Sequence, residues 1–226
     1  TVSVSGTLDI CPGSSTTLDL TNPLPVATGI TYQWKSYNGT IYVNEGTASS
    51  SSSLIASPSS SKSYYCEILC NGTPVRNTDT VLVKVQTITT SPVTSSVTCN
   101  GLCNGSATIN ASSFGVTLTY AWTSAVSTSD LASNLCAGLY TVTITNPTGC
   151  VITETVSITE PAVLAVTLSQ TNISCYGLTD GIATATVTGG VSPLNYNWLP
   201  TGGTALTANN LSAGNYTFNV IDANSC

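Results

Sequence analysis

The chain has 226 residues and a formal net charge of −6, with only 6% charged residues and no His. The four basic residues, the last of them Lys84, form no cluster that could neutralise phosphates, which excludes nucleic acid and anionic membrane surfaces as partners. The hydrophobic content of 41% excludes a disordered chain. No apolar run is long enough for a bilayer, so the chain is predicted not to be membrane-spanning.

Thr, Val, Ile and Tyr dominate the ordered-looking stretches, and no long window has apolar residues at helical spacing. The chain is therefore predicted to be all-β. In residues 1–88 the expected strands are "SSTTLDL", "ITYQWKSY", "TIYVNEG", "SYYCEIL" and "DTVLVKVQ". A Ser-rich run at residues 49–53 is expected to be a loop.

Trp34 lies in one of these strands, and Tyr64 stands two residues before Cys66. This pattern resembles an immunoglobulin-like domain, with the Trp of a central strand and a tyrosine corner before a cysteine. Cys11 departs from the pattern, because it precedes a strand that would hold it in an antibody-type domain. We expect Cys11 to bond Cys66 or Cys70. With Cys66 as its partner, Cys70 is left free or forms an intermolecular bond.

The later part of the chain contains a tandem repeat, since residues 99–150 align without a gap on residues 175–226. The aligned identities are Cys99 and Cys175, Gly105 and Gly181, Tyr120 and Tyr196, Trp122 and Trp198, Leu135 and Leu211, Gly138 and Gly214, Tyr140 and Tyr216, and Cys150 and Cys226. Stretches such as "GIATATVTGG" and "GNYTFNV" alternate apolar and polar residues, as half-buried strands do. Each copy is predicted to be a small β-sandwich around its Trp.

The predicted fold is all-β, with tandem immunoglobulin-like β-sandwich domains in a linear array. The expected domains are residues 1–88 (immunoglobulin-like), 89–163 (first repeat) and 164–226 (second repeat). The first repeat continues after Cys150 with "VITETVSITEP", a predicted strand, whereas the second repeat has no equivalent after Cys226. Either the sequence is part of a longer one, or the domain lacks a strand. In the second case another chain's "TVSVSGTLDI" segment could fill the open edge.

Nine cysteines in a weakly charged β protein indicate an oxidising compartment and disulfides. Cys99 with Cys150 and Cys175 with Cys226 are the expected bridges within the copies, although pairing across neighbouring copies is an alternative. Cys103 and Cys136 are replaced together in the second copy, by Thr179 and Ser212, which predicts that they form a bond. A zinc site is not expected, because the Cys spacings occur without any His.

The second copy has a motif composed of Cys175, Asp180-Gly181, Gly189-Gly190, Pro193, Tyr196, Trp198, Asn210-Leu211, Ala213-Gly214, Tyr216-Thr217 and Asp222-Ala223. This motif resembles the SprB-type repeat of Bacteroidetes surface proteins. The first copy departs from it with "SSFG" for "VTGG" and "TNPTG" for "IDANS". The resemblance covers residues 90–226. It implies a large protein exported by the type IX secretion system, whose repeats form a stalk, adhesin or filament without catalytic residues.

Enzymatic activity is not expected, since there is no His and the ten acidic residues never cluster in the sequence. No cofactor or metal is expected. Calcium binding at Asp180 and Asp222 is a weaker alternative to turn hydrogen bonding, because Asn104 and Asn146 replace both acids in the first copy. "DTV" resembles the O-glycosylation motif of Bacteroidetes, with Thr80 as the acceptor.

The sequence thus predicts a structural extracellular repeat protein that forms a stalk, adhesin or filament on the cell surface. Its expected partners are copies of itself or neighbouring domains of the same large protein. The alternative is a glycan-binding module of a secreted protein, with surface glycans as ligands. Trp34, Trp122 and Trp198 are expected to be core residues, which leaves Tyr37 and Tyr42 as the freer aromatic candidates.

Overall fold

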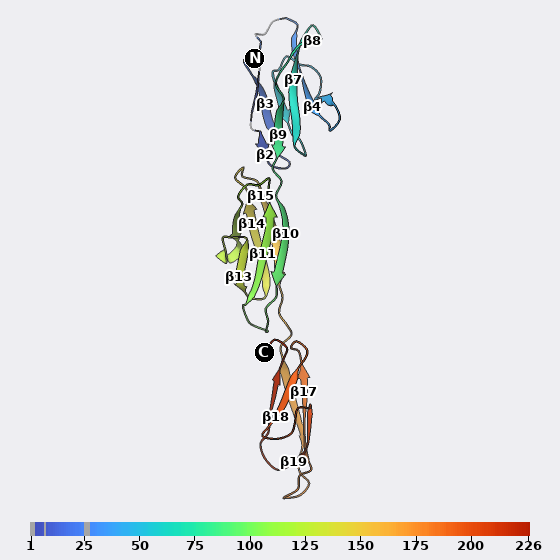
Figure 1. Cartoon of the computed structure of the whole chain (residues 1–226), viewed down its shortest axis with the longest axis vertical. Helices are drawn as coiled ribbons and strands as arrows, with labels where there is room; N and C mark the ends of the chain where they lie inside the picture. The colour runs from blue at the N-terminus through green and yellow to red at the C-terminus, as the bar shows by residue number, and fades with distance from the viewer. Residues whose placement is uncertain (1–2, 7, 25–27) are drawn as a thin grey trace. The chain divides into compact units, whose positions relative to one another are not determined.

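The computed structural model describes residues 3–6, 8–24 and 28–226, and nearly all of its regular structure is β-strand (Figure 1). The one helical element in these ranges is a short 3-10 turn at Thr123–Ala125. The prediction of an all-β chain is confirmed. No helix in the described ranges is long and apolar enough to cross a membrane.

The first segment, residues 3–88 as described, contains two sheets. The smaller sheet has the order β1-β3-β6, formed by β1 (Ser3–Ser5), β3 (Thr16–Thr21) and β6 (Ser53–Ala56). The larger sheet has the order β2-β9-β7-β4-β5, with β8 also paired to β7. Its strands are β2 (Asp9–Ile10), β4 (Ile30–Tyr37), β5 (Tyr42–Asn44), β7 (Lys62–Cys70), β8 (Thr73–Asn77) and β9 (Val81–Val85).

Alternating side chains from both sheets of the first segment form one apolar core. In β3 the residues Thr16, Leu18 and Leu20 are buried, while the residues between them are exposed. Leu18 and Leu20 share a cluster with Trp34 of β4 and Cys66 of β7. The period-2 pattern of "TTLDL" therefore places one face of the strand in the core and the other in water.

The middle copy, residues 89–163, also has two sheets. The first has the order β10-β11-β13, from β10 (Thr89–Ser95), β11 (Gly105–Ser112) and β13 (Leu131–Leu135). The second has the order β12-β14-β15, from β12 (Thr119–Trp122), β14 (Gly138–Thr145) and β15 (Val151–Ile158). Val156 and Ile158 of β15 are buried, at 5% and 2% exposure.

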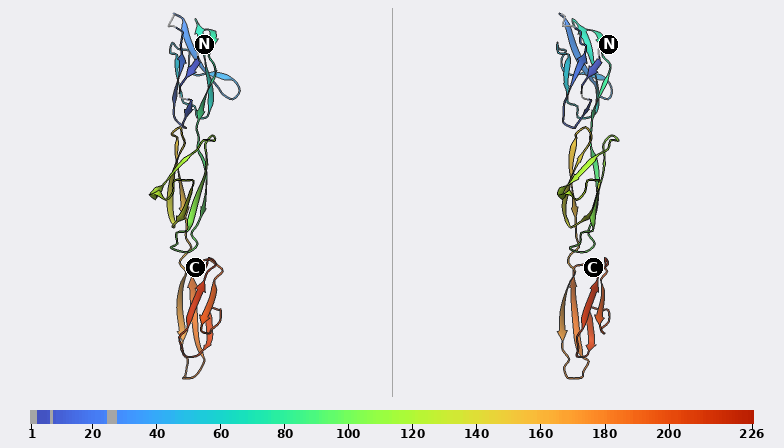
Figure 2. Two further views of the ribbon diagram at one scale, coloured as in Figure 1. Left: turned by 60° about the vertical axis from the view of Figure 1, so that its left-hand side comes forward. Right: turned by 90° about the vertical axis from the view of Figure 1, so that its left-hand side faces the viewer.

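The last copy, residues 164–226, repeats this arrangement with one strand fewer (Figures 1 and 2). One sheet has the order β16-β17-β19, from β16 (Ala165–Thr171), β17 (Gly181–Thr188) and β19 (Thr207–Leu211). These bounds lie 76 residues after those of β10, β11 and β13. The other sheet contains only β18 (Asn195–Leu199) and β20 (Thr217–Ile221). In the described chain, β20 has no strand on the side where β14 has β15.

The described chain divides into two compact units. One contains residues 1–90, 111–119 and 143–153, and the other contains residues 91–110, 120–142 and 154–226. The division into three domains expected from the sequence stays a prediction. Of the "TVSVSGTLDI" segment considered as a donor strand, residues 1, 2 and 7 lie outside the described residues. Its residues Ser3–Ser5 form β1, which is paired with β3 of the same chain.

Candidate functional site: bonded turns and an open pocket

Three disulfides join cysteines of the chain: Cys11 to Cys150, Cys99 to Cys226, and Cys103 to Cys136. The third bond confirms the pairing predicted from the joint replacement of Cys103 and Cys136. The other two bonds follow a different rule. Each joins the first cysteine of one segment to the last cysteine of the next, so these bonds link successive segments instead of closing each one.

The expected bridges Cys99–Cys150 and Cys175–Cys226 are therefore wrong. The last copy shows the physical reason. Cys175 precedes β17, whose first residue Gly181 pairs with Leu211 at the end of β19. The chain then turns back through β20 and reaches Cys226 at the other end of that strand. A strand of five residues spans roughly 17 Å, whereas bonded cysteines have Cα atoms less than about 7 Å apart.

The expected pairing of Cys11 with Cys66 or Cys70 is also wrong. Cys11 follows Ile10, which pairs with Val85 at the end of β9. This end of β9 lies beside Lys62, because Lys62 pairs with Val83. Cys66 lies four residues further along β7, roughly 13 Å away, and Cys70 lies at the far end of that strand. Cys66, Cys70 and Cys175 are free thiols, and Cys175 is exposed.

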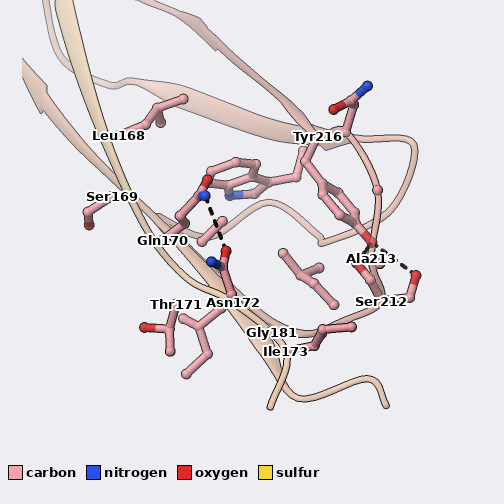
Figure 3. Close-up of a pocket in the computed structure, with 16 residues that line it drawn as sticks. Leu168, Ser169, Gln170, Thr171, Asn172, Ile173, Gly181, Ser212, Ala213 and Tyr216 are labelled. Carbon is pink, nitrogen blue, oxygen red and sulfur yellow. Dashed lines mark hydrogen bonds between the residues drawn. The ribbon is translucent and has the colours of Figure 1, made fainter. Parts of the chain in front are cut away.

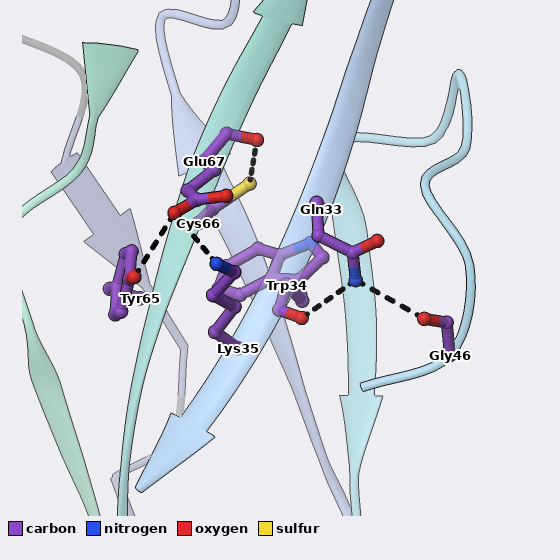
Figure 4. Close-up of polar contacts among 7 residues, drawn as sticks. All are labelled: Gln33, Trp34, Lys35, Gly46, Tyr65, Cys66 and Glu67. Carbon is purple, nitrogen blue, oxygen red and sulfur yellow. Dashed lines mark hydrogen bonds and ion pairs between the residues drawn. The ribbon is translucent and has the colours of Figure 1, made fainter. Parts of the chain in front are cut away.

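Cys66 lies in a polar network inside the first segment (Figure 4). Its side chain is fully buried, and this burial raises the pKa of the thiol to about 12. On the next residue, the Glu67 carboxylate forms an ion pair with Lys35 at 2.8 Å, which raises the pKa of Lys35. The buried Gln33 side chain donates to the carbonyls of Trp34 and Gly46, at 3.0 and 3.2 Å. The ion pair of this network ties β4 to β7.

The turns that carry the first cysteine of each copy have the same hydrogen bonds. Asn104 accepts a bond from the Thr98 N–H at 3.0 Å, and its counterpart Asp180 accepts one from the Ser174 N–H at 3.1 Å. The Ser174 hydroxyl also donates to Asp180, and together these bonds lower the pKa of its carboxyl group. Cys175 thus lies in a turn built like that of Cys99, but without a disulfide partner in the described chain.

The last copy contains an open pocket of about 460 Å³. It lies between β16 with its following residues and the turn that leads into β20 (Figure 3). Its apolar lining includes Leu168, Ile173, Trp198, Leu211 and Tyr216, and backbone is exposed to it at Gly181. The Tyr216 hydroxyl donates a hydrogen bond to the Ser212 carbonyl at 3.2 Å.

In the middle copy, β15 occupies the space that corresponds to this pocket. The Cγ2 atom of Ile158 lies 2.6 Å from the point that a Cβ on Gly105 would take. Gly105 is the counterpart of Gly181, which lines the pocket. The Val97 N–H donates to the Thr159 carbonyl at 3.1 Å, and Val97 is the counterpart of the pocket residue Ile173. The pocket is therefore the place that β15 fills in the other copy.

The two acids considered for calcium serve the turns. Asp222 accepts bonds from the N–H groups of Val191, Asn224 and Cys226, and these bonds lower the pKa of its carboxyl group. Within the described residues, no three His, Cys, Asp or Glu side chains lie close enough to hold a metal ion. Both acids accept hydrogen bonds of their turns, as the turn interpretation predicts.

The three Trp side chains are buried, as predicted, at 3–5% exposure. Tyr37 is 41% exposed and contacts Tyr42, which contacts Tyr65, with ring centroids 5.2 and 4.8 Å apart. Thr80, the predicted glycosylation acceptor, lies in an exposed connection before β9. Its glycosylation stays a prediction.

Sequence reasoning found the open edge of the last copy but not the pocket beside it. The signal was present in the register of the repeat, because the buried pair Val156 and Ile158 has no counterpart in the last copy. Without such a pair beside them, core residues of the described last copy are uncovered. A scan of the sequence against protein-family models finds no match, and a search of curated proteins finds no relative.

Proposed function

We propose that this chain is a structural extracellular repeat protein that forms part of a stalk, adhesin or filament on a cell surface. The observation that supports this role best is the disulfide pattern, because Cys11–Cys150 and Cys99–Cys226 link successive segments. Links of this kind resist separation of the segments, which is the demand on a load-bearing protein. The resemblance of residues 90–226 to SprB-type repeats supports the same role, including export by type IX secretion to the surface of a member of the Bacteroidetes.

Disulfides also suit a protein outside the cell, where thiols are oxidised. Cys175 holds the position in the last copy that Cys99 holds in the middle copy. By the same rule, we propose that Cys175 bonds the last cysteine of another repeat. The series of disulfides between successive segments would then gain one bond with each further repeat.

The mechanical role can be tested by pulling the chain by its two ends in a single-molecule force experiment. With all three bonds intact, the shortest covalent route from the N-terminus to Cys226 crosses at Cys11–Cys150, Cys136–Cys103 and Cys99–Cys226. That route contains only about 30 residues of extendable chain, or roughly 100 Å. The fully reduced chain can reach roughly 800 Å at the same spacing per residue.

We expect the maximum length of the oxidised chain to be several hundred ångströms shorter than that of the reduced chain. A Cys99→Ser/Cys226→Ser variant is the matched control. Its shortest route crosses only at Cys11–Cys150 and contains about 90 residues, so it should recover roughly 200 Å of the lost extension. Equal extension of the oxidised and reduced chains would contradict the load-bearing role.

Glycan binding is the second candidate, and the contact of Tyr37 with Tyr42 favours it. The two rings and that of Tyr65 give the first segment a partly exposed aromatic surface, of the kind that binding sites use with nearby polar groups. This function predicts that a Tyr37→Ala/Tyr42→Ala variant loses binding on a glycan array while its melting temperature stays unchanged. A parent chain that binds no glycan on the array would dismiss the candidate.

A further inference from the structure

Beside the pocket of the last copy lie the free edge of β20 and partly exposed core side chains. In the middle copy, β15 covers the corresponding edge and side chains. Strand β20 pairs with β18 alone in the described chain, whereas β14 pairs with both β12 and β15. The second edge of β20 therefore presents backbone N–H and C=O groups without a strand partner. Such an edge is a template for one more strand.

The core beside this edge is correspondingly uncovered. Val142 and Ile144 of β14 are fully buried, whereas their counterparts Phe218 and Val220 in β20 are only partly buried. The same holds for Val97, which is 3% exposed, and its partly exposed counterpart Ile173. Phe218 and Tyr216 pack on the small core of the last copy, and Tyr216 also lines the pocket. Burial of these side chains by an added strand would stabilise both partners.

We propose that the pocket is a strand acceptor that binds the strand following the last cysteine of a repeat. Residues 151–158 are the example of such a strand on this chain. The bound segment is extended, hydrogen-bonds to the free edge of β20, and places a Val-x-Ile pair in the pocket. This proposal rests on the structural role proposed above and deepens it by naming the kind of segment that binds beside β20.

The contacts of β15 define how the strand binds. Ile158 lies against Gly105, so the second apolar residue of the bound strand is expected against Gly181. The Thr159 carbonyl accepts from Val97, so the carbonyl of the next residue is expected to accept from the Ile173 N–H. Ser96 and Thr159 share a side-chain hydrogen bond at 2.6 Å, and Asn172 stands at the position of Ser96. A polar residue after the Val-x-Ile pair is therefore expected to form a hydrogen bond with the Asn172 side chain.

The test adds a synthetic peptide with the sequence of residues 151–159, "VITETVSIT", to the full 226-residue chain. Hydrogen exchange followed by mass spectrometry measures the protection of amides. We expect exchange of residues 217–221 and 173 to slow by about tenfold or more at saturating peptide. Residues 138–145 serve as the internal control and should not change, because β15 already covers that edge.

Two further peptides identify the occupant. A peptide with Ser at the positions of Val156 and Ile158 keeps the backbone but loses the apolar pair, and it should give no protection. The peptide "TVSVSGTLD", from residues 1–9, represents the N-terminal strand of a second copy. Stronger protection by this peptide would overturn the proposal in favour of that donor.

A tethered version removes the dependence on affinity. The nine residues are joined directly to Cys226, as β15 is joined to Cys150, and the same Ser-substituted segment is the control. We expect the extended chain to protect residues 217–221 and the Ser control not to. If neither the free nor the tethered strand protects β20, the proposal is wrong. The disulfide-dependent extension in the force experiment would be unaffected, so the two failures are distinguishable.

Discussion

Asn146 and Asp222 occupy the same position in the two copies, and each accepts a hydrogen bond from the N–H of the cysteine four residues later. The distance is 2.9 Å from Cys150 to Asn146 and 2.9 Å from Cys226 to Asp222. Both of these cysteines form disulfides that link successive segments. The acceptor therefore fixes the backbone of the turn that presents the last cysteine, whether or not it is charged.

Asp222 and Asp180 carry a charge that their counterparts Asn146 and Asn104 lack. This difference predicts an effect of pH on the stability of the last copy alone. Hydrogen bonds lower the pKa values of Asp222 and Asp180 from the ordinary value of 3.8. A lowered pKa in the folded state stabilises the fold above the unfolded-state pKa, and this stabilisation is lost as the pH falls through the lower folded-state value. Below about pH 4, we expect faster hydrogen exchange in the turns at 174–180 and 222–226.

The matched variant is Asp180→Asn/Asp222→Asn, which gives the last copy the residues of the middle copy. Its exchange in these turns should be nearly independent of pH between about 2 and 6, after correction for intrinsic rates. An unchanged acid response in this variant would assign the effect to other groups.

The free cysteines are predicted to differ in reactivity. Cys175 is exposed, whereas the pKa of the buried Cys66 thiol is raised to about 12, so almost none of it is thiolate at neutral pH. Brief iodoacetamide treatment of the native chain should alkylate Cys175 first and Cys66 only after unfolding. Peptide mass spectrometry over time measures the order. Early labelling of Cys66 would be inconsistent with its place in the core.

The local bond of the middle copy should be transferable to the last copy. Thr179→Cys/Ser212→Cys places cysteines at the positions of Cys103 and Cys136, which are bonded across 33 residues. Closing such a loop is worth up to about 4 kcal/mol on the chain-entropy model. We expect a new disulfide by mass spectrometry under non-reducing conditions and a higher melting temperature for the last copy. The single variant Thr179→Cys is the control, and it should not raise the melting temperature.

The three Trp residues allow the contribution of the indole hydrogen bond to the free energy of unfolding to be measured. Trp122 donates to the Ser129 carbonyl at 2.8 Å and Trp198 to the Ala205 carbonyl at 3.0 Å. The buried Trp34 indole N–H has no partner within the described residues. We expect Trp122→Phe and Trp198→Phe to cost about 1 kcal/mol more than Trp34→Phe, because only they lose a bond. Urea unfolding followed by circular dichroism compares the variants, and equal costs would contradict this assignment.

The strands and the repeat could be predicted from the sequence because both follow from local patterns. The strand-like stretch "SSTTLDL" predicted β3, and the joint replacement of Cys103 and Cys136 identified their bond. The partners of Cys99 and Cys150 could not be predicted in this way. Each copy contains both cysteines, and this local pattern favours an internal bridge. The direction in which β20 leaves the β17–β19 end is a tertiary property, and it places Cys226 away from Cys175.

The two long bonds close loops that overlap. One loop runs from Cys11 to Cys150 and the other from Cys99 to Cys226, so every peptide bond between Cys11 and Cys226 lies inside at least one of them. A protease that cuts the backbone once anywhere in this span leaves all the pieces covalently attached. Between Cys99 and Cys150 the two loops cover the chain twice. The protein therefore stays in one piece after a single nick, and fragments are released only when a cut is combined with reduction or further cleavage.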